Sequence, residues 1–243
     1  MKERLANGVT LYYEKMGEGP ALILLHGNGE SHHSFDAVAP VLAEHFTVYG
    51  VDSRGQGKSS HQGEPLTYEQ MAEDTDLFIQ SLQLSDVSIM GHSDGAITAL
   101  ILGMQKKEYL SHLILLSINL NTVDLTQETK DLIDDLYEES GRSPLVELML
   151  DEPDILHDDL RQVTVPALVV AGDNDILVTA DYAEIAGYLP VSQLYIVPGA
   201  NHMDFLFGTD RIAPEVIRFL TTERGEIVRQ NQSGVFGQND PRR

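Results

Sequence analysis

The sequence predicts an α/β fold in which helices flank a mostly parallel central sheet and a small helical lid covers one edge of it. Short runs rich in β-branched residues alternate with longer segments of helical period, as in strand–helix–strand units. Several of the short runs are apolar nearly throughout, which is typical of strands buried on both faces. An acidic helical stretch interrupts the alternation once, and this interruption predicts the lid.

The expected elements follow one another along most of the chain. Strands are expected at residues 9–15, 21–25, 46–51, 87–90, 113–116, 167–171 and 193–197. Helices are expected at residues 35–44, 67–84, 94–107, 180–188 and 211–220. Because each late helix separates two apolar strands, these strands are expected to run parallel.

The stretch 119–163 contains no convincing strand, and helical period recurs in TKDLIDDLYEES and SPLVELMLDE. Helices inserted here would lie above the carboxyl ends of the sheet, where open α/β folds bind ligands. We therefore divide the chain into an α/β core, residues 1–118 and 164–222, and a helical lid, residues 119–163. A C-terminal tail, residues 223–243, loses apolar periodicity and is interpreted either as a mobile end or as an arm that packs on the core.

Charge and composition narrow the class of partner. The formal net charge of −22 makes nucleic acid and anionic membrane poor partners, because phosphate binding needs clustered Lys and Arg. Acidic residues concentrate between Asp124 and Asp159, where the only cations are Lys130 and Arg142. This segment is interpreted either as a solvated face or as a field that attracts cationic ligands.

The absence of cysteine and of long apolar runs limits the possible chemistry and the expected location of the protein. The chain has no cysteine, so disulfides, thiolate metal sites and a cysteine nucleophile are excluded. No apolar run approaches the roughly 20 residues that span a bilayer, and the start MKERLANGVT lacks the apolar core of a secretion signal. We expect a cytoplasmic protein that acts on a small molecule without a cofactor or metal. The oligomeric state is not predicted.

The pentapeptide GHSDG, residues 91–95, joins an apolar strand to a helix. Nucleophilic serine chemistry needs an exposed hydroxyl beside a base, with hydrogen-bond donors ready for the negative charge that develops on the substrate oxygen. A strand that turns sharply into a helix provides this arrangement, and Gly91 and Gly95 stand where a side chain would crowd the turn. Ser93 is therefore the predicted nucleophile.

A serine nucleophile requires a histidine base and an acid to orient it. His202 follows the strand expected at 193–197, and Asp173 and Asp175 follow the strand at 167–171, so the order is Ser, Asp, His. Spacing favours Asp175 over Asp173 only weakly, and Asp204 is a more remote candidate. Other histidines are expected to be structural (His26, His92), to line the mouth (His32, His33) or to lie off the candidate loops (His45, His61, His112, His157).

At this point the chain resembles an α/β-hydrolase-fold serine hydrolase of the carboxylesterase type. Four separated motifs support the resemblance: LHGNG at 25–29, DSRGQGKS at 52–59, GHSDG at 91–95 and GDND at 172–175. The resemblance implies an oxyanion hole made by the backbone amides of Asn28 and Asp94, and it assigns the acid to Asp175. It implies structural roles for Asp52 and Arg54. The implied reaction is hydrolysis of a small carboxylic ester through an acyl-enzyme.

Asp94 stands beside the nucleophile, where many members of the family carry an apolar residue. One interpretation is that its carboxylate caps the following helix and accepts free amides. The other is that it binds a cationic group of the substrate, since GHSDGAITAL resembles the elbow of the valacyclovir-hydrolase-like branch, whose members take amino-acid esters. A carboxylate near a developing oxyanion also disfavours anionic substrates.

Three alternatives remain open. Carbon–carbon bond hydrolases of the same fold share the triad, but they normally need cationic or polar side chains for a carboxylated substrate. Aminopeptidases that act on an amino-terminal proline share a preference for cations but usually carry a longer lid. A receptor that binds a ligand with slow or no turnover is the alternative of another class.

Overall fold

The computed structural model describes residues 1–61 and 66–222, and the predicted tail, residues 223–243, lies outside this range. Eight strands form one sheet in the order β1-β2-β4-β3-β5-β6-β7-β8. Their bounds are β1 Lys2–Arg4, β2 Thr10–Met16, β3 Ala21–Leu25, β4 Thr47–Val51, β5 Val87–His92, β6 Leu110–Leu116, β7 Ala167–Asn174 and β8 Ser192–Asn201. From β4 to β8 every neighbouring pair is parallel, whereas β1 and β2 are antiparallel additions. The predicted mostly parallel sheet is confirmed.

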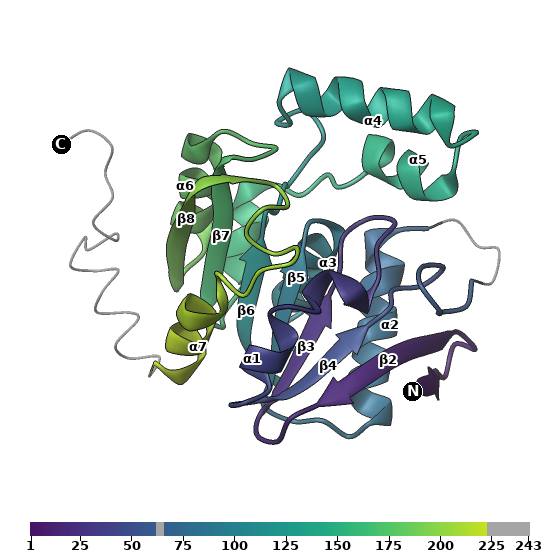
Figure 1. The fold of residues 1–243 in the computed structure, drawn as a ribbon, viewed down its shortest axis with the longest axis vertical. Coiled ribbons are helices and arrows are strands. Elements are labelled where there is room, and N and C mark those ends of the chain that lie inside the picture. Colours follow the sequence, from purple (N-terminus) through teal and green to yellow (C-terminus); the bar gives the residue numbers. More distant parts are fainter. Residues whose placement is uncertain (62–65, 223–243) are drawn as a thin grey trace.

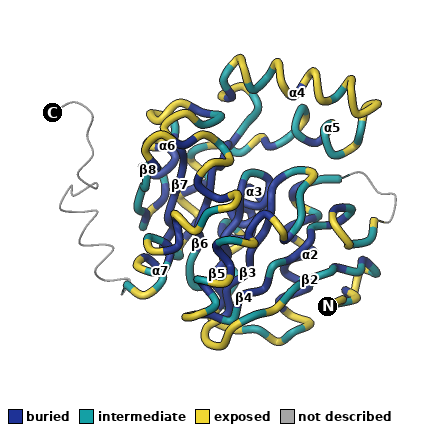
Figure 2. Tube along the Cα trace, in the orientation of Figure 1, coloured by how far each residue is buried: buried dark blue, intermediate teal, exposed yellow. Residues whose placement is uncertain are grey.

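Helices cover both faces of the sheet (Figure 1). One face carries α2 Tyr68–Ser81, α3 Asp94–Met104 and α6 Thr179–Tyr188, and the other carries α1 Ala39–Leu42 and α7 Ala213–Thr221. A separate hydrophobic core lies on each face of the sheet. Strand β3 contributes to both cores, because its alternate side chains point to opposite faces. Ile23 and Leu25 pack with the α2–α3 side, and Leu22 and Leu24 pack with the α1–α7 side. The apolar run ALILL is therefore buried throughout, as is β5 beside it, whereas the outer strands β2 and β8 are partly exposed (Figure 2).

Two elements differ in kind from the sequence-based expectation, and β6, β7 and β8 are longer than the strands expected at 113–116, 167–171 and 193–197. The helix expected at 35–44 is a 3₁₀ turn at His32–Phe35 followed by the short helix α1. Pro40 lies in the first turn of α1, where a missing backbone N–H costs nothing, so the helix starts there and not at Phe35. Strand β1 was not expected, because three polar residues, KER, show no apolar alternation; it forms by antiparallel pairing with β2.

The lid segment between β6 and β7 contains two helices, α4 Gln127–Glu139 and α5 Pro144–Asp151, and a 3₁₀ turn at His157–Gln162. Thr126 and Ser143 cap the two helices through their side-chain oxygens. The helices lie across the carboxyl ends of the strands (Figure 1), and the outer side of α4 is exposed (Figure 2). Ile133 and Leu148 are the side chains that the two helices bury.

The parallel strands end at one edge of the sheet, beneath the lid. Asn28 follows β3, Ser93 follows β5, and Asp175 follows β7 directly, while His202 follows β8. The sheet order places these loops next to one another although they are far apart in sequence. Among the described residues, no helix is long and apolar enough to cross a membrane.

Candidate active site

Ser93 occupies a strained turn between β5 and α3, with φ 52° and ψ −116°. Positive φ is unfavourable for a residue with a Cβ atom and marks positions that the surrounding structure enforces. The two flanking glycines allow the close packing: a Cβ atom on Gly91 would lie 2.1 Å from the carbonyl oxygen of Gly95, and one on Gly95 would lie 2.1 Å from that of Leu25. The turn therefore holds Ser93 at the top of the sheet, where it lines a cavity.

His202 is paired with Asp175. The Nδ1 atom of His202 lies 2.8 Å from Oδ1 of Asp175, whose side chain is fully buried. An ionised carboxylate only accepts, so Nδ1 carries the hydrogen and Nε2 keeps its lone pair. Burial is the largest influence on the pKa of His202 and lowers it, against the opposing effect of the hydrogen bond to Asp175. The imidazole is therefore held neutral at pH 7, the state that a general base requires.

Asp175 is fixed as an anion by several donors. Its Oδ2 atom accepts from the backbone N–H of Gly172 at 2.9 Å and from the hydroxyl of Ser117 at 2.5 Å, and its Oδ1 atom accepts from the N–H of Ile176 at 2.8 Å. Burial, the largest single influence, raises the pKa of Asp175, but these hydrogen bonds and His202 outweigh it and lower the pKa.

The two competing acids lie elsewhere. Asp173 is exposed and accepts from the side chain of its neighbour Asn174. Asp204 is also exposed and accepts from the N–H of Asn201 at 3.4 Å. The structure therefore places Asp175, and neither of these two, against His202.

A buried contact joins the His202 loop to the turn after β3. Nε2 of the fully buried His92 lies 3.0 Å from the backbone carbonyl of His202, to which it donates, and the two imidazole rings are 4.8 Å apart. On its other side, Nδ1 of His92 lies 3.7 Å from the carboxylate of Glu30, which also accepts from the N–H of Gly27 at 3.0 Å. His92 was expected to be structural, and it supports the backbone of the candidate base.

The carboxylate of Asp94 is buried and accepts two side-chain hydrogen bonds. Oδ2 accepts from Nδ2 of Asn28 at 2.9 Å, and Oδ1 accepts from the hydroxyl of Tyr68 at 2.8 Å. Burial, the main cause, raises the pKa of Asp94 to about 6. Asp94 lies in the first turn of α3, but its hydrogen bonds run to Asn28 and Tyr68 and not to helix amides. The expectation that the carboxylate accepts free amides of its own helix is therefore wrong.

The backbone amides of Asn28 and Asp94 have the features of oxyanion donors. Neither N–H donates a hydrogen bond to another residue within 1–61 and 66–222. The side-chain bond between Asn28 and Asp94 holds the two residues together beside Ser93. Nearby, Asp52 accepts the backbone N–H groups of His32 and Lys58, and Arg54 forms two 2.7 Å bonds to Asp74, so both residues stabilise their loop, as the resemblance implies.

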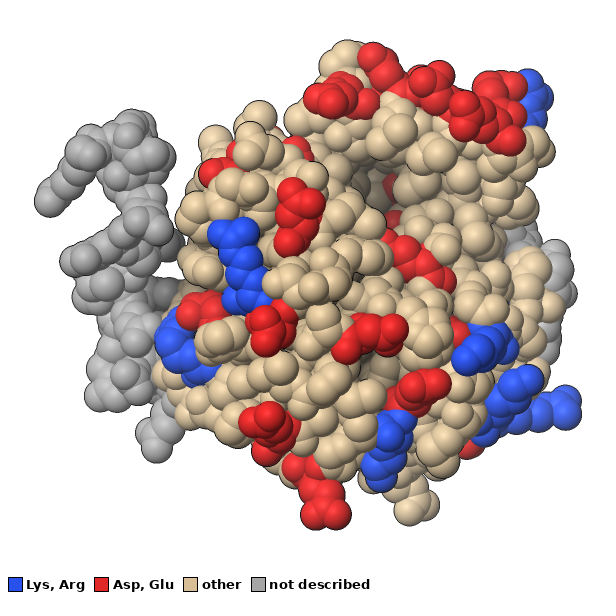
Figure 3. Space-filling view, in the orientation of Figure 1, with Lys and Arg blue, Asp and Glu red and all other residues tan. Residues whose placement is uncertain are grey.

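Ser93, Asp94 and His202 share the wall of one cavity of about 150 Å³ between the core and the lid, and Figure 3 shows a hollow beneath the lid. The lid contributes mainly apolar side chains to this cavity: Leu125, Leu132, Ile133, Leu136 and Met149. Leu132 and Leu136 are 57% and 40% exposed, which places them at its opening. A cavity of this size holds a group on the order of benzene, so the space suits a small acyl group.

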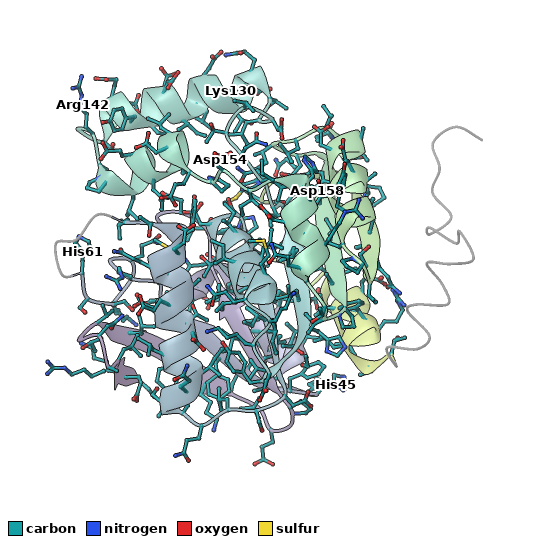
Figure 4. All side chains as sticks on the ribbon, turned by 180° about the vertical axis from the view of Figure 1, so that it is seen from behind. His45, His61, Lys130, Arg142, Asp154 and Asp158 are labelled. Carbon is teal, nitrogen blue, oxygen red and sulfur yellow. The ribbon has the colours of Figure 1, made fainter. Side chains whose placement is uncertain are left out.

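The cavity is acidic. Asp94 and Glu152 line it, whereas none of the described lining residues is Lys or Arg. The lid segment contains three cations, and none of them lines the cavity. Lys130 and Arg142 lie on α4 and beyond its end (Figure 4), where they contact the carbonyl of Val123 and the carboxylate of Glu138, and Arg161 pairs with Asp158. Acidic side chains also follow the outer edge of the lid in Figure 3. An anionic substrate would meet no opposite charge on these walls.

The lining residues that the sequence analysis did not single out include Tyr68 and Glu152. Tyr68 begins α2 and Glu152 ends α5, so neither follows a strand, and no motif marks them. Figure 4 labels His45 and His61 away from the lid. Neither lines the cavity, as expected for histidines outside the candidate loops. No group of His, Asp and Glu side chains in the described part of the chain could hold a metal ion.

Comparison with known proteins places this geometry in a family. Residues 20–143 match the family model of the alpha/beta hydrolase fold. The chain is 24% identical to 2-hydroxy-6-oxo-6-(2'-aminophenyl)hexa-2,4-dienoic acid hydrolase of Metapseudomonas resinovorans, with 92% of this chain and 91% of the relative covered. It is 28% identical to the human (Homo sapiens) serine hydrolase BPHL, with 81% and 78% covered.

The fold is also shared with solved structures. An esterase from Exiguobacterium antarcticum superposes with a TM-score of 0.79 at 22% identity, covering 91% of this chain and 99% of the other. The protein therefore belongs to the α/β-hydrolase-fold family. More particularly, it is a hydrolase of that superfamily, and its relatives include the dienoic acid hydrolase of Metapseudomonas resinovorans and the human serine hydrolase BPHL.

Proposed function

We propose that the protein is a serine hydrolase that cleaves small carboxylic esters and favours substrates whose acyl group carries an amine. The main support is the arrangement at the cavity: Ser93 and His202 line the same cavity, and the Nδ1 atom of His202 lies 2.8 Å from Asp175. The ligand is a small molecule, in keeping with the volume beneath the lid.

In the proposed mechanism, Nε2 of His202 takes the hydroxyl proton of Ser93 as the serine oxygen attacks the ester carbonyl. The backbone amides of Asn28 and Asp94 donate to the oxyanion that forms. His202 then gives its proton to the leaving alcohol, which leaves an acyl-enzyme. In the second step His202 takes a proton from the water that attacks the acyl carbonyl, and it returns this proton to the Ser93 oxygen as the acyl–serine bond breaks and the carboxylic acid leaves. Asp175 stays ionised and stabilises the imidazolium at each step.

The preference for an amine follows from the charge of the cavity. Ionised Asp94 next to an oxyanion destabilises it unless a cation lies between them. An ammonium group on the α-carbon of the acyl group would neutralise Asp94 and lie close to the reacting carbonyl. Neutral esters lack this contribution.

A carbon–carbon bond hydrolase is less well supported. The relative from Metapseudomonas resinovorans is named for an acid as its substrate. The lining of this cavity offers such a carboxylate two more carboxylates and, among the described residues, no Lys or Arg. An aminopeptidase would share the amine preference and differ in the bond cleaved.

The test is steady-state hydrolysis of an alanine ester and the matching propionate ester by the wild type, Ser93→Ala and Asp94→Asn. We expect turnover to require Ser93 and the amine preference to disappear in Asp94→Asn. Turnover that requires Ser93 but ignores the amine would leave an ester hydrolase without the assigned preference. Binding of the esters without repeated turnover would instead favour a receptor, and faster cleavage of an alanine amide would favour an aminopeptidase.

A further inference from the structure

The lid contributes a second carboxylate to the cavity. Glu152 is the residue that ends α5, is half-buried, and lines the cavity together with Asp94. Its Oε2 atom accepts the backbone N–H of Tyr68 at 3.0 Å, while the hydroxyl of Tyr68 donates to Asp94 at 2.8 Å. Glu152 and Asp94 therefore contact the two ends of one tyrosine and line the same cavity.

The two carboxylates differ in how many donors they have. Both oxygens of Asp94 accept hydrogen bonds, from Asn28 and Tyr68. Glu152 has the N–H of Tyr68 on Oε2, and within the described residues Oε1 has no donor. Burial, together with the nearby carboxylates of Glu69 and Asp151, raises the pKa of Glu152 against the effect of that hydrogen bond. Its surroundings therefore disfavour the negative charge, and a cation bound there would relieve this cost.

We propose that Glu152 is a specificity-determining residue that binds a second cationic group of the substrate, so that esters of diamino acids such as ornithine and lysine are preferred. This inference rests on the proposed function, in which Asp94 receives the α-ammonium group. The acyl group would extend from Ser93 past the ring of Tyr68, with its side-chain ammonium at Glu152.

The apolar part of the cavity lining suits such an acyl group. Ile133 and Met149 of the lid line the cavity and present apolar surface to it. The methylene stem of ornithine or lysine packs on apolar surface while the charged end reaches a polar partner. A neutral side chain of the same length, as in norvaline or norleucine, would gain the apolar contacts but not the contact with Glu152.

The test compares matched substrates whose side chains differ in one charge: ornithine with norvaline methyl ester, and lysine with norleucine methyl ester. The quantity measured is the ratio of kcat/KM within each pair. Glu152→Gln keeps an oxygen that can accept the N–H of Tyr68 and removes only the charge. Glu147→Gln makes the same charge change on the exposed side of α5 and is the matched control.

We expect the wild type to prefer the diamino ester in at least one pair by roughly 10- to 100-fold, the range of a hydrogen bond to a charged group. Glu152→Gln should bring the ratio close to one, and Glu147→Gln should leave it at the wild-type value. An unchanged ratio in Glu152→Gln would overturn the proposal. An equal fall of the kcat/KM ratio in both variants would also overturn the proposal. The preference would then come from the overall negative charge of the lid and not from a contact with Glu152.

The same ratios are measured for binding of the esters to Ser93→Ala, so that the result does not depend on turnover. Tighter binding of the diamino ester that requires Glu152 supports the inference even if hydrolysis fails. Conversely, Ser93-dependent hydrolysis of alanine esters with no diamino preference in either binding or turnover overturns the role of Glu152 and leaves the proposed function intact.

Discussion

The amine preference should depend on pH through Asp94. Below its pKa of about 6 the carboxyl group is neutral and cannot pair with an ammonium group, and above it the group is ionised. The α-ammonium of an amino-acid ester stays largely protonated between pH 5 and pH 7. The preference for an alanine ester over the matching propionate ester is therefore expected to rise with pH over this interval.

The size of this rise follows from the pKa of Asp94. With a pKa of about 6, about one tenth of Asp94 is ionised at pH 5 and about nine tenths at pH 7. If only the ionised form contributes the preference, that contribution increases about tenfold. Any change in the protonation of His202 affects both esters equally, so the ratio of their kcat/KM values removes it.

The assay measures kcat/KM for the two esters at half-unit steps from pH 5 to pH 7, in the wild type, Asp94→Asn and Asp173→Asn. Asp173 is the matched control because it is exposed and does not line the cavity. The wild type and Asp173→Asn should show the rise, and Asp94→Asn should give a flat ratio. A flat ratio in the wild type, or a rise that survives in Asp94→Asn, would refute the assignment of the cation to Asp94.

Two further predictions concern the triad and the elbow. Asp175→Asn should lower kcat roughly 10³- to 10⁴-fold, because the amide no longer holds His202 with its hydrogen on Nδ1; a loss below tenfold in steady-state hydrolysis would contradict the orienting role. Gly95→Ala should lower the free energy of unfolding by about 1–3 kcal/mol, since its Cβ would lie 2.1 Å from the backbone oxygen of Leu25. Its control in urea denaturation is Gly187→Ala in α6, where nothing lies within 4 Å and a gain of about 0.5–1 kcal/mol is expected. Equal effects of the two substitutions would contradict the packing argument.

The sequence predicts the sheet well because each buried strand is a short apolar run that can be recognised without its neighbours. An apolar run such as ALILL can be buried on both faces only in the middle of a sheet, and the β3 strand has the expected bounds. The lid helices were predicted from their own period, with bounds close to those observed. β1 and the length of α1 were not predicted, because strand pairing decides the first and the placement of Pro40 the second.

Local sequence patterns likewise predict only some residues of the candidate site. Ser93, Asp175 and His202 stand in loops after strands, where spacing and motifs mark them. Tyr68 and Glu152 reach the cavity from helix ends and contact residues distant in sequence: 26 positions separate Tyr68 from Asp94, and 84 separate Tyr68 from Glu152. Such contacts depend on how the lid packs on the core, which local patterns do not encode.

Lid position and the charge of the site are linked through shared hydrogen-bond donors. The side-chain amide of Asn28 donates both to Asp94 and to the carbonyl of Leu145 in α5, at 2.9 and 2.7 Å. Tyr68 likewise donates both to Asp94 and, through its backbone, to Glu152 at the end of the same helix. Each donor of Asp94 therefore also holds one end of α5. Displacing that helix would remove a restraint from both donors at once, so the lid that shapes the cavity also fixes the environment in which the Asp94 carboxylate ionises.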